Sequence, residues 1–165
     1  MVMKNKFKAV EILLIEDNPG DVRLIKEAFK GGKLINNLHV VEDGIEALDY
    51  LRKQGKFHDG PTPDLILLDL NLPKKDGREL LAEIKEDQHF KHIPVIVLTT
   101  SNAEADITES YKSRANCYIT KPVEMNQFIK IVEYIEFFGL LWLNYHQIKI
   151  LYKSIIIKYW VISKY

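Results

Sequence analysis

Carboxylates follow two apolar segments of the chain, and a hydroxyl and an amine accompany two others. Glu16 and Asp17 come directly after VEILLI, and Asp69 comes directly after LILL. Thr99 ends the segment VIVLT, and Lys121 follows NCYIT. Carboxylates that a fold brings together repel one another unless one is protonated or a cation lies between them. If the fold gathers these residues, they predict binding of a hard cation and attachment of a phosphoryl group to a carboxylate.

Apolar segments rich in Val, Ile and Leu alternate with segments whose apolar residues fall at helical spacing. Four apolar residues precede Asp69 without a polar break, which is typical of a strand buried on both faces of a parallel sheet. We expect strands at residues 10–15, 38–41, 65–69, 95–99 and 116–119, and helices at residues 22–30, 45–54, 78–86, 103–113 and 124–138. This order predicts a doubly wound α/β fold, in which the carboxyl ends of the parallel strands meet at one ligand-binding edge.

At that edge, the expected metal ligands are all oxygen atoms. Such a set favours Mg²⁺, which binds shallow sites with few carboxylates and keeps several waters. Lys121 would supply a fixed positive charge and Thr99 a hydroxyl donor, so both could hold the oxygens of a phosphoryl group on Asp69. Transfer of that group needs mainly alignment and charge neutralisation.

Each of these residues also has a simpler interpretation. Glu16 and Asp17 precede Asn-Pro-Gly and could belong to a turn, with Asp21 as the expected cap of the first helix. The segment Thr99-Thr100-Ser101 could cap the next helix, and Lys121 could be an ordinary solvated lysine. The arrival of all these features at strand ends, in the right order, favours a shared site.

Composition indicates one globular domain. The 165 residues contain 23 basic and 23 acidic side chains, so no excess of positive charge suggests binding to nucleic acid. Cys117 is the single cysteine, which excludes a disulfide within the chain and fits a reducing cytoplasm. Acidic residues interrupt the N-terminal segment before it reaches the apolar length of a signal peptide.

Four motifs resemble those of the receiver domains of two-component response regulators, of the chemotaxis-regulator type. They are IEDN (15–18), LLDLNLPKKDG (67–77), VLTTS (97–101) and YITKP (118–122), within a resemblance that extends over about residues 11–138. The resemblance implies a flavodoxin-like five-stranded sheet with strand order 2-1-3-4-5 and five helices. It also implies a receiver domain at residues 1–138.

The resemblance implies a function for each residue of the site. Asp69 would be the phosphoacceptor, and Mg²⁺ would be bound by Glu16, Asp17, Asp69 and the main-chain carbonyl of Asn71. Thr99 and Lys121 would contact the phosphoryl group.

The resemblance further implies residues that switch or tune the domain. Tyr118 would change rotamer when Thr99 moves. Asn71, Thr100 and Ser101 occupy positions that tune hydrolysis, and Thr100 is bulkier than the small residue common there. Neither Asn71 nor Ser101 carries a carboxylate or a general base, so we expect no unusually fast self-dephosphorylation.

Longer segments are similar to the phytochrome-associated single-domain regulators. These segments are EALDYLRKQG, LNLPKKDGRELL, TTSNAEADI and NCYITKPV. This similarity implies a sensor histidine kinase of the phytochrome type as the phosphodonor. It also implies a homodimer through the fourth helix, the fifth strand and the fifth helix (103–113, 116–119 and 124–138), with Cys117 and Tyr118 contributing.

The tail, residues 139–165, is apolar and basic, with four lysines and no acid. We expect it to extend the fifth helix and pack in a dimer. Lysines interrupt its apolar stripe too often for a transmembrane span. A basic amphipathic helix that lies on a membrane or pairs with a partner is a less favoured alternative. An altered reading frame is the third alternative.

Taken together, the sequence predicts a cytoplasmic response regulator without an output domain. It would accept a phosphoryl group from a histidine kinase on Asp69 and switch partner binding or dimerisation, catalysing only its own phosphorylation and dephosphorylation. A phosphorelay shuttle and a phosphate-independent pseudo-receiver are the alternatives. A phosphatase is disfavoured because Asn71 stands two residues after Asp69, where such hydrolases usually carry a second acid.

Overall fold

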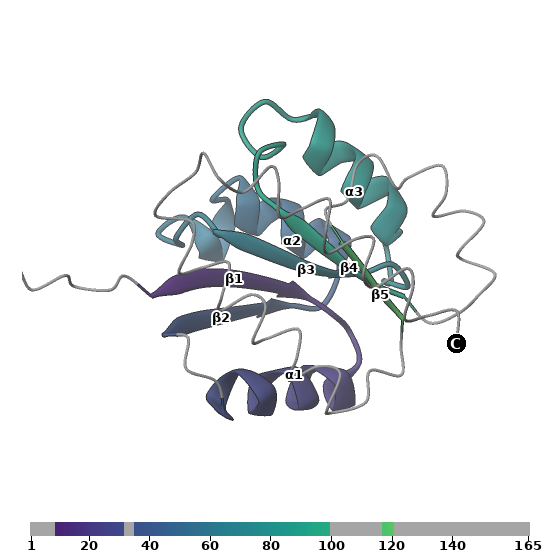
Figure 1. The fold of residues 1–165 in the computed structure, drawn as a ribbon. Helices are drawn as coiled ribbons and strands as arrows, with labels where there is room; N and C mark the ends of the chain where they lie inside the picture. Colours follow the sequence, from purple (N-terminus) through teal and green to yellow (C-terminus); the bar gives the residue numbers. More distant parts are fainter. Residues whose placement is uncertain (1–8, 32–34, 100–116, 121–165) are drawn as a thin grey trace, which may run out of the picture.

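A parallel sheet organises the computed structural model, which describes residues 9–31, 35–99 and 117–120 (Figure 1). The elements are β1 (Val10–Ile15), α1 (Pro19–Gly31), β2 (Asn36–Val41), α2 (Gly44–Leu51), the short 3₁₀ helix η1 (Gly55–Phe57), β3 (Leu65–Asp69), α3 (Gly77–Glu86), β4 (Val95–Thr99) and β5 (Cys117–Thr120). The strand order is β2-β1-β3-β4-β5 and every pair is parallel. The doubly wound α/β fold and the strand order 2-1-3-4-5 are therefore confirmed. The helices expected at 103–113 and 124–138 and the tail at 139–165 lie outside the described residues.

Helices cover both faces of the sheet. Figure 1 shows α1 on one face and α2 and α3 on the other. All five residues of β3 are buried, because this strand lies between β1 and β4 and carries packed side chains on each face. Leu65 and Leu67 pack in the cluster that contains the α1 residues, whereas Ile66 and Leu68 pack with those of α2 and α3. The apolar run before Asp69 is therefore unbroken because β3 is buried on both faces of the sheet, as predicted.

The first helix begins earlier than expected. Asn18 caps it in place of Asp21: its side-chain oxygen accepts hydrogen bonds from the Gly20 and Asp21 N–H groups, at 2.8 and 3.3 Å. Pro19 is the first residue of α1, a position where its fixed φ and missing N–H are tolerated. The expectation that Asp21 caps this helix was therefore wrong.

None of the helices within the described residues combines the length and apolar character needed to cross a bilayer.

The second helix, expected to continue to residue 54, ends at Leu51.

Gly77 fixes the distance between α3 and the end of β3. A Cβ atom on Gly77 would lie 2.4 Å from the Asp69 carbonyl oxygen and 2.6 Å from the Leu70 Cα atom. Both neighbours are backbone atoms, so neither can rotate away. The Gly77 N–H also donates a hydrogen bond to the Leu70 carbonyl at 3.0 Å. Only a residue without a side chain fits at the start of α3.

Tyr50 is the buried polar side chain of α2, only 3% exposed. Its ring lies 5.5 Å from the His39 ring and meets the Phe57 ring edge-on at 5.2 Å, between centroids. Within the described residues its hydroxyl has no hydrogen-bond partner. Burial, aided by the Glu11 carboxylate, raises the pKa of Tyr50 from 10.0 to about 12.

We expect Gly77→Ala to destabilise the domain by about 1–3 kcal/mol, because the new methyl group must displace the backbone at the end of β3. Urea unfolding followed by circular dichroism measures this. Gly31→Ala is the matched control, since a Cβ there meets nothing within 4 Å. Equal stability of the two variants would contradict the close approach.

Tyr50→Phe should change how stability depends on alkaline pH. The unfolded chain releases this proton near pH 10 and the folded chain near pH 12, so the wild type keeps full stability below about pH 10. It then loses about 2–3 kcal/mol as the pH rises through about 12. The variant lacks this loss, and at pH 7 it should be at least as stable, because an unpartnered buried hydroxyl is removed. Parallel urea titrations from pH 7 to about pH 11.5 decide the point, and identical pH profiles would refute it.

Candidate functional site

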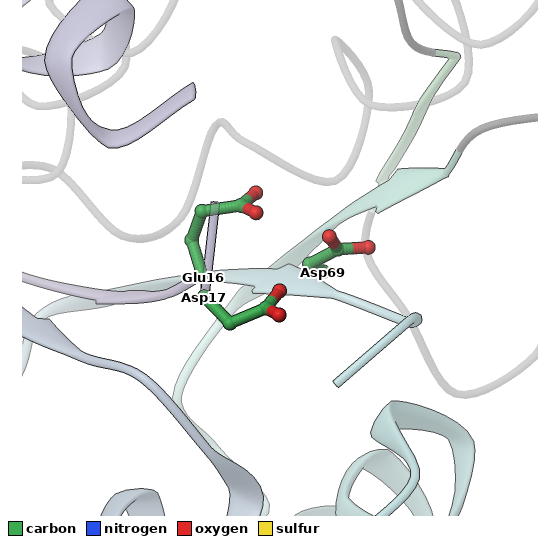
Figure 2. A group of neighbouring side chains, drawn as sticks. All are labelled: Glu16, Asp17 and Asp69. Carbon is green, nitrogen blue, oxygen red and sulfur yellow. The ribbon is translucent and has the colours of Figure 1, made fainter. Parts of the chain in front are cut away.

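Three carboxylates meet at the carboxyl edge of the sheet. Glu16 and Asp17 follow β1 directly, and Asp69 is the last residue of β3 (Figure 2). One oxygen atom from each of the three lies within 4.8 Å of the others. The register explains this meeting, because β1 and β3 are neighbours with Ile15 opposite Leu68. The predicted cluster is therefore formed by two adjacent strands of the core.

Main-chain groups hold two of these carboxylates. The Asn18 N–H donates a hydrogen bond to Glu16 Oε1 at 3.1 Å, and the Asn71 N–H donates one to Asp69 Oδ1 at 3.0 Å. Glu16 is fully buried and Asp69 is 3% exposed, whereas Asp17 is exposed. The cluster thus has two fixed, buried members and one at the surface.

A divalent cation fits this set of residues. Three carboxylates at such separations repel one another strongly in a largely buried site, and a cation between them removes that repulsion. The donors are all carboxylate oxygens, which hard ions such as Mg²⁺ and Mn²⁺ prefer. Glu16, Asp17 and Asp69 would hold the ion, with room for further oxygen ligands on the exposed side of Asp17.

The other predicted residues fall at the same edge or outside the described residues. Asn71 is exposed and stands at the start of the loop after β3, bonded to Asp69 through its N–H. The backbone of Thr99 ends β4, one position beyond Leu98, which pairs with Asp69. The backbone of Tyr118 lies in β5 opposite Val97. Thr100, Ser101 and Lys121 lie outside the part of the chain that the structure describes.

A cavity of about 470 Å³ opens beside Glu16 and Asp17. Its wall includes Val22, Arg23 and Lys26 of α1, together with residues at the end of β2. Arg23 and Lys26 are not among the residues predicted from the sequence. Their helical spacing of three residues, in the helix that follows the acidic pair, is the signal that could have identified them.

Asp43 and Lys74 were also missed. The Lys74 ammonium group donates a hydrogen bond to Asp43 Oδ2, joining the loop after β3 to the start of α2. Burial raises the pKa of Asp43, but the hydrogen bonds from Lys74 and from the Glu46 and Ile45 N–H groups outweigh it and leave the pKa below its ordinary value. The hydrogen bond to Asp43 raises the pKa of Lys74. Both side chains are therefore charged at neutral pH.

Comparison with known proteins gives one consistent result. The profile of the family described as response regulator receiver domain matches residues 12–133. The chain is 49% identical over 129 residues to the response regulator Rcp1 of Synechocystis sp., a match that covers 78% of this chain and 88% of Rcp1.

Solved structures agree with this result. The fold is similar to that of the phosphorylated cyanobacterial phytochrome response regulator RcpA, with a TM-score of 0.71, 52% identity, and coverage of 81% of this chain and 95% of that one. It is also similar to the Mn²⁺-bound form of Rcp1, with a TM-score of 0.68, 48% identity, and coverage of 77% and 91%. Since the profile spans more than half of the chain and the motifs lie within it, this chain belongs to the response regulator receiver domain family.

Proposed function

We propose that this protein accepts a phosphoryl group on Asp69, with Mg²⁺ bound by Glu16, Asp17, Asp69 and the main-chain carbonyl of Asn71. The observation that carries the proposal is the meeting of three carboxylate oxygens within 4.8 Å at the carboxyl ends of β1 and β3. The similarity to a phosphorylated RcpA and to a Mn²⁺-bound Rcp1 supports it.

The chemistry follows from charge and position. A carboxylate oxygen of Asp69 attacks the phosphorus of a phosphohistidine, the P–N bond breaks, and the imidazole leaves with its electron pair and takes up a proton. The Asn71 N–H on Oδ1 fixes the plane of the attacking carboxylate. A divalent cation held by the three carboxylates would neutralise the charge that they share with the phosphoryl oxygens. In this proposal, the Thr99 hydroxyl and the Lys121 ammonium contact those oxygens.

The proposed phosphodonor is a sensor histidine kinase of the phytochrome type. The names of the similar proteins support this, since RcpA is described as a phytochrome response regulator. The protein would act in the cytoplasm and catalyse only its own phosphorylation and dephosphorylation.

The proposed output is a change in partner binding or in homodimerisation through β5 and the helices expected on either side of it. The position of β5 supports this, because β5 lies at one edge of the described sheet. Thr99 and Tyr118 would transmit the switch, and Asn71, Thr100 and Ser101 would set the lifetime of the acyl phosphate.

Acetyl phosphate with Mg²⁺ should add one phosphoryl group to the wild-type protein and none to Asp69→Asn. Intact-protein mass spectrometry, with and without EDTA, gives the readout. Asp59→Asn is the control, because it makes the same substitution at an aspartate outside the carboxylate cluster. The Asp59 side chain is 88% exposed and lies in a loop. Labelling of Asp69→Asn at the wild-type level would exclude Asp69 as the acceptor. A lack of labelling in the wild type would favour the phosphate-independent pseudo-receiver.

Phosphotransfer should discriminate between kinases. A phytochrome-type histidine kinase, first labelled with radioactive ATP, should transfer phosphate to this protein at least about tenfold faster than an unrelated histidine kinase. Quench-flow sampling and gel autoradiography measure both rates. Equal rates would leave the receiver chemistry intact but remove the assignment of the partner.

A further inference from the structure

The loop that joins β3 to α3, residues 70–76, is attached to the rest of the domain at both ends. At its start, the Asn71 N–H bonds Asp69 Oδ1 at 3.0 Å, and the Leu70 N–H bonds the Leu98 carbonyl of β4 at 3.3 Å. At its end, Asp76 caps α3 by accepting a hydrogen bond from the Arg78 N–H at 2.8 Å. The middle of the loop carries Lys74, and this residue makes a separate contact with α2.

Asp43, a residue that is only 6% exposed, receives that contact on its carboxylate. Its Oδ1 accepts hydrogen bonds from the Ile45 and Glu46 N–H groups at 2.9 and 2.8 Å, which caps α2. Its Oδ2 accepts the hydrogen bond from Lys74. One carboxylate therefore fixes the start of a helix and the middle of the loop at the same time.

The loop backbone adopts a conformation that requires such support. Lys74 has a φ of 65°, in the left-handed region that residues other than glycine rarely adopt. Next to it, the Lys75 carbonyl oxygen lies 2.8 Å from the position that a Cβ on Gly44 would take. The loop thus presses its backbone against the first residue of α2, immediately beside Asp43.

We propose that the Asp43–Lys74 pair positions the phosphorylation site, by holding the loop so that the Asn71 main chain and the Asp69 carboxylate keep their metal-binding arrangement. Lys74 is three residues from Asn71 in a short loop. A change of φ at Lys74 therefore displaces the loop backbone, including the main chain of Asn71. Groups that orient metal ligands from outside commonly change metal affinity when they are removed. The inference rests on the proposed function of the carboxylate cluster and adds two positioning residues to it.

Mn²⁺ affinity of the full chain tests the proposal, measured from the electron paramagnetic resonance signal of the free ion. Lys74→Met should weaken Mn²⁺ binding about tenfold and slow labelling by acetyl phosphate. Lys56→Met is the matched control. Lys56 is a similarly exposed lysine that pairs with Glu46 in the first turn of α2. The side chains are 70% exposed for Lys56 and 64% for Lys74.

This control separates position from charge. Each variant removes one positive charge, and loss of a positive charge by itself favours cation binding. Lys56→Met should therefore bind Mn²⁺ at least as tightly as the wild type, whereas Lys74→Met should bind it more weakly. Lys74→Arg, which keeps the charge and the donor, should restore most of the affinity.

Two more variants keep the test decisive if Lys74→Met folds poorly. Lys74→Gly accepts the left-handed φ without strain, so the domain should stay folded. Mn²⁺ binding should still weaken, because glycine is flexible and no ammonium group then holds the loop against Asp43. Asp43→Asn keeps an oxygen for the α2 cap. In that background, Lys74→Met should have no further effect on Mn²⁺ affinity.

Wild-type affinity in both Lys74→Met and Lys74→Gly would overturn the proposal, as would a full second effect of Lys74→Met in the Asp43→Asn background. Failure of the proposed function looks different: the wild type would bind Mn²⁺ but take up no phosphoryl group. The comparison of the Lys74 and Lys56 variants would still decide the positioning inference in that case. Absence of Mn²⁺ binding in the wild type would refute both.

Discussion

Repulsion among Glu16, Asp17 and Asp69 is the constraint on which the site depends. The strands that carry these residues cannot separate, because β1 and β3 are hydrogen-bonded neighbours inside a core packed on both faces. Two of the three carboxylates are almost completely buried, so water screens their repulsion poorly. The fold thus holds negative charge in a fixed place, and the energy gained when a cation or a proton neutralises it is available to drive binding and chemistry.

The same core fixes the backbone of Asp69. Asp69 is fixed on one side by the sheet and on the other by α3, whose first residue, Gly77, leaves no room at the Asp69 carbonyl. Beyond the strand, the Asp69 carboxylate is bonded to the following loop through the Asn71 N–H. In the loop after β3, the strained φ at Lys74 and the ion pair with Asp43 set how far that loop can relax.

Features encoded by local pattern could be predicted from the sequence. The alternation of strands and helices and the buried strand before Asp69 follow from runs and spacings that lie close together in the chain. The carboxylate cluster joins residues far apart in the chain, but it follows from that alternation, because the carboxyl ends of parallel strands meet at one edge of the sheet. The cap of α1 was predicted wrongly because Asp21 looked like the better cap, whereas Pro19 suits the first helical position and gives the cap to Asn18. The Asp43–Lys74 pair joins residues 31 positions apart and depends on a left-handed φ at a lysine, and neither feature leaves a local pattern.

The two faces of the sheet contribute different properties to the site. On the α2 and α3 face, ion pairs hold the loop after β3: Lys74 pairs with Asp43, and Lys75 pairs with Glu83 at 2.8 Å. Glu83 in turn pairs with Arg52 at 2.7 Å, so α2 and α3 are joined through the residue that holds the loop. On the α1 face, the cavity beside Glu16 and Asp17 leaves space next to the carboxylates. A reactant that approaches from the α1 side thus meets carboxylates whose positions are set from the opposite side of the sheet. One set of residues therefore controls access to the carboxylates, and another set controls the geometry of the site.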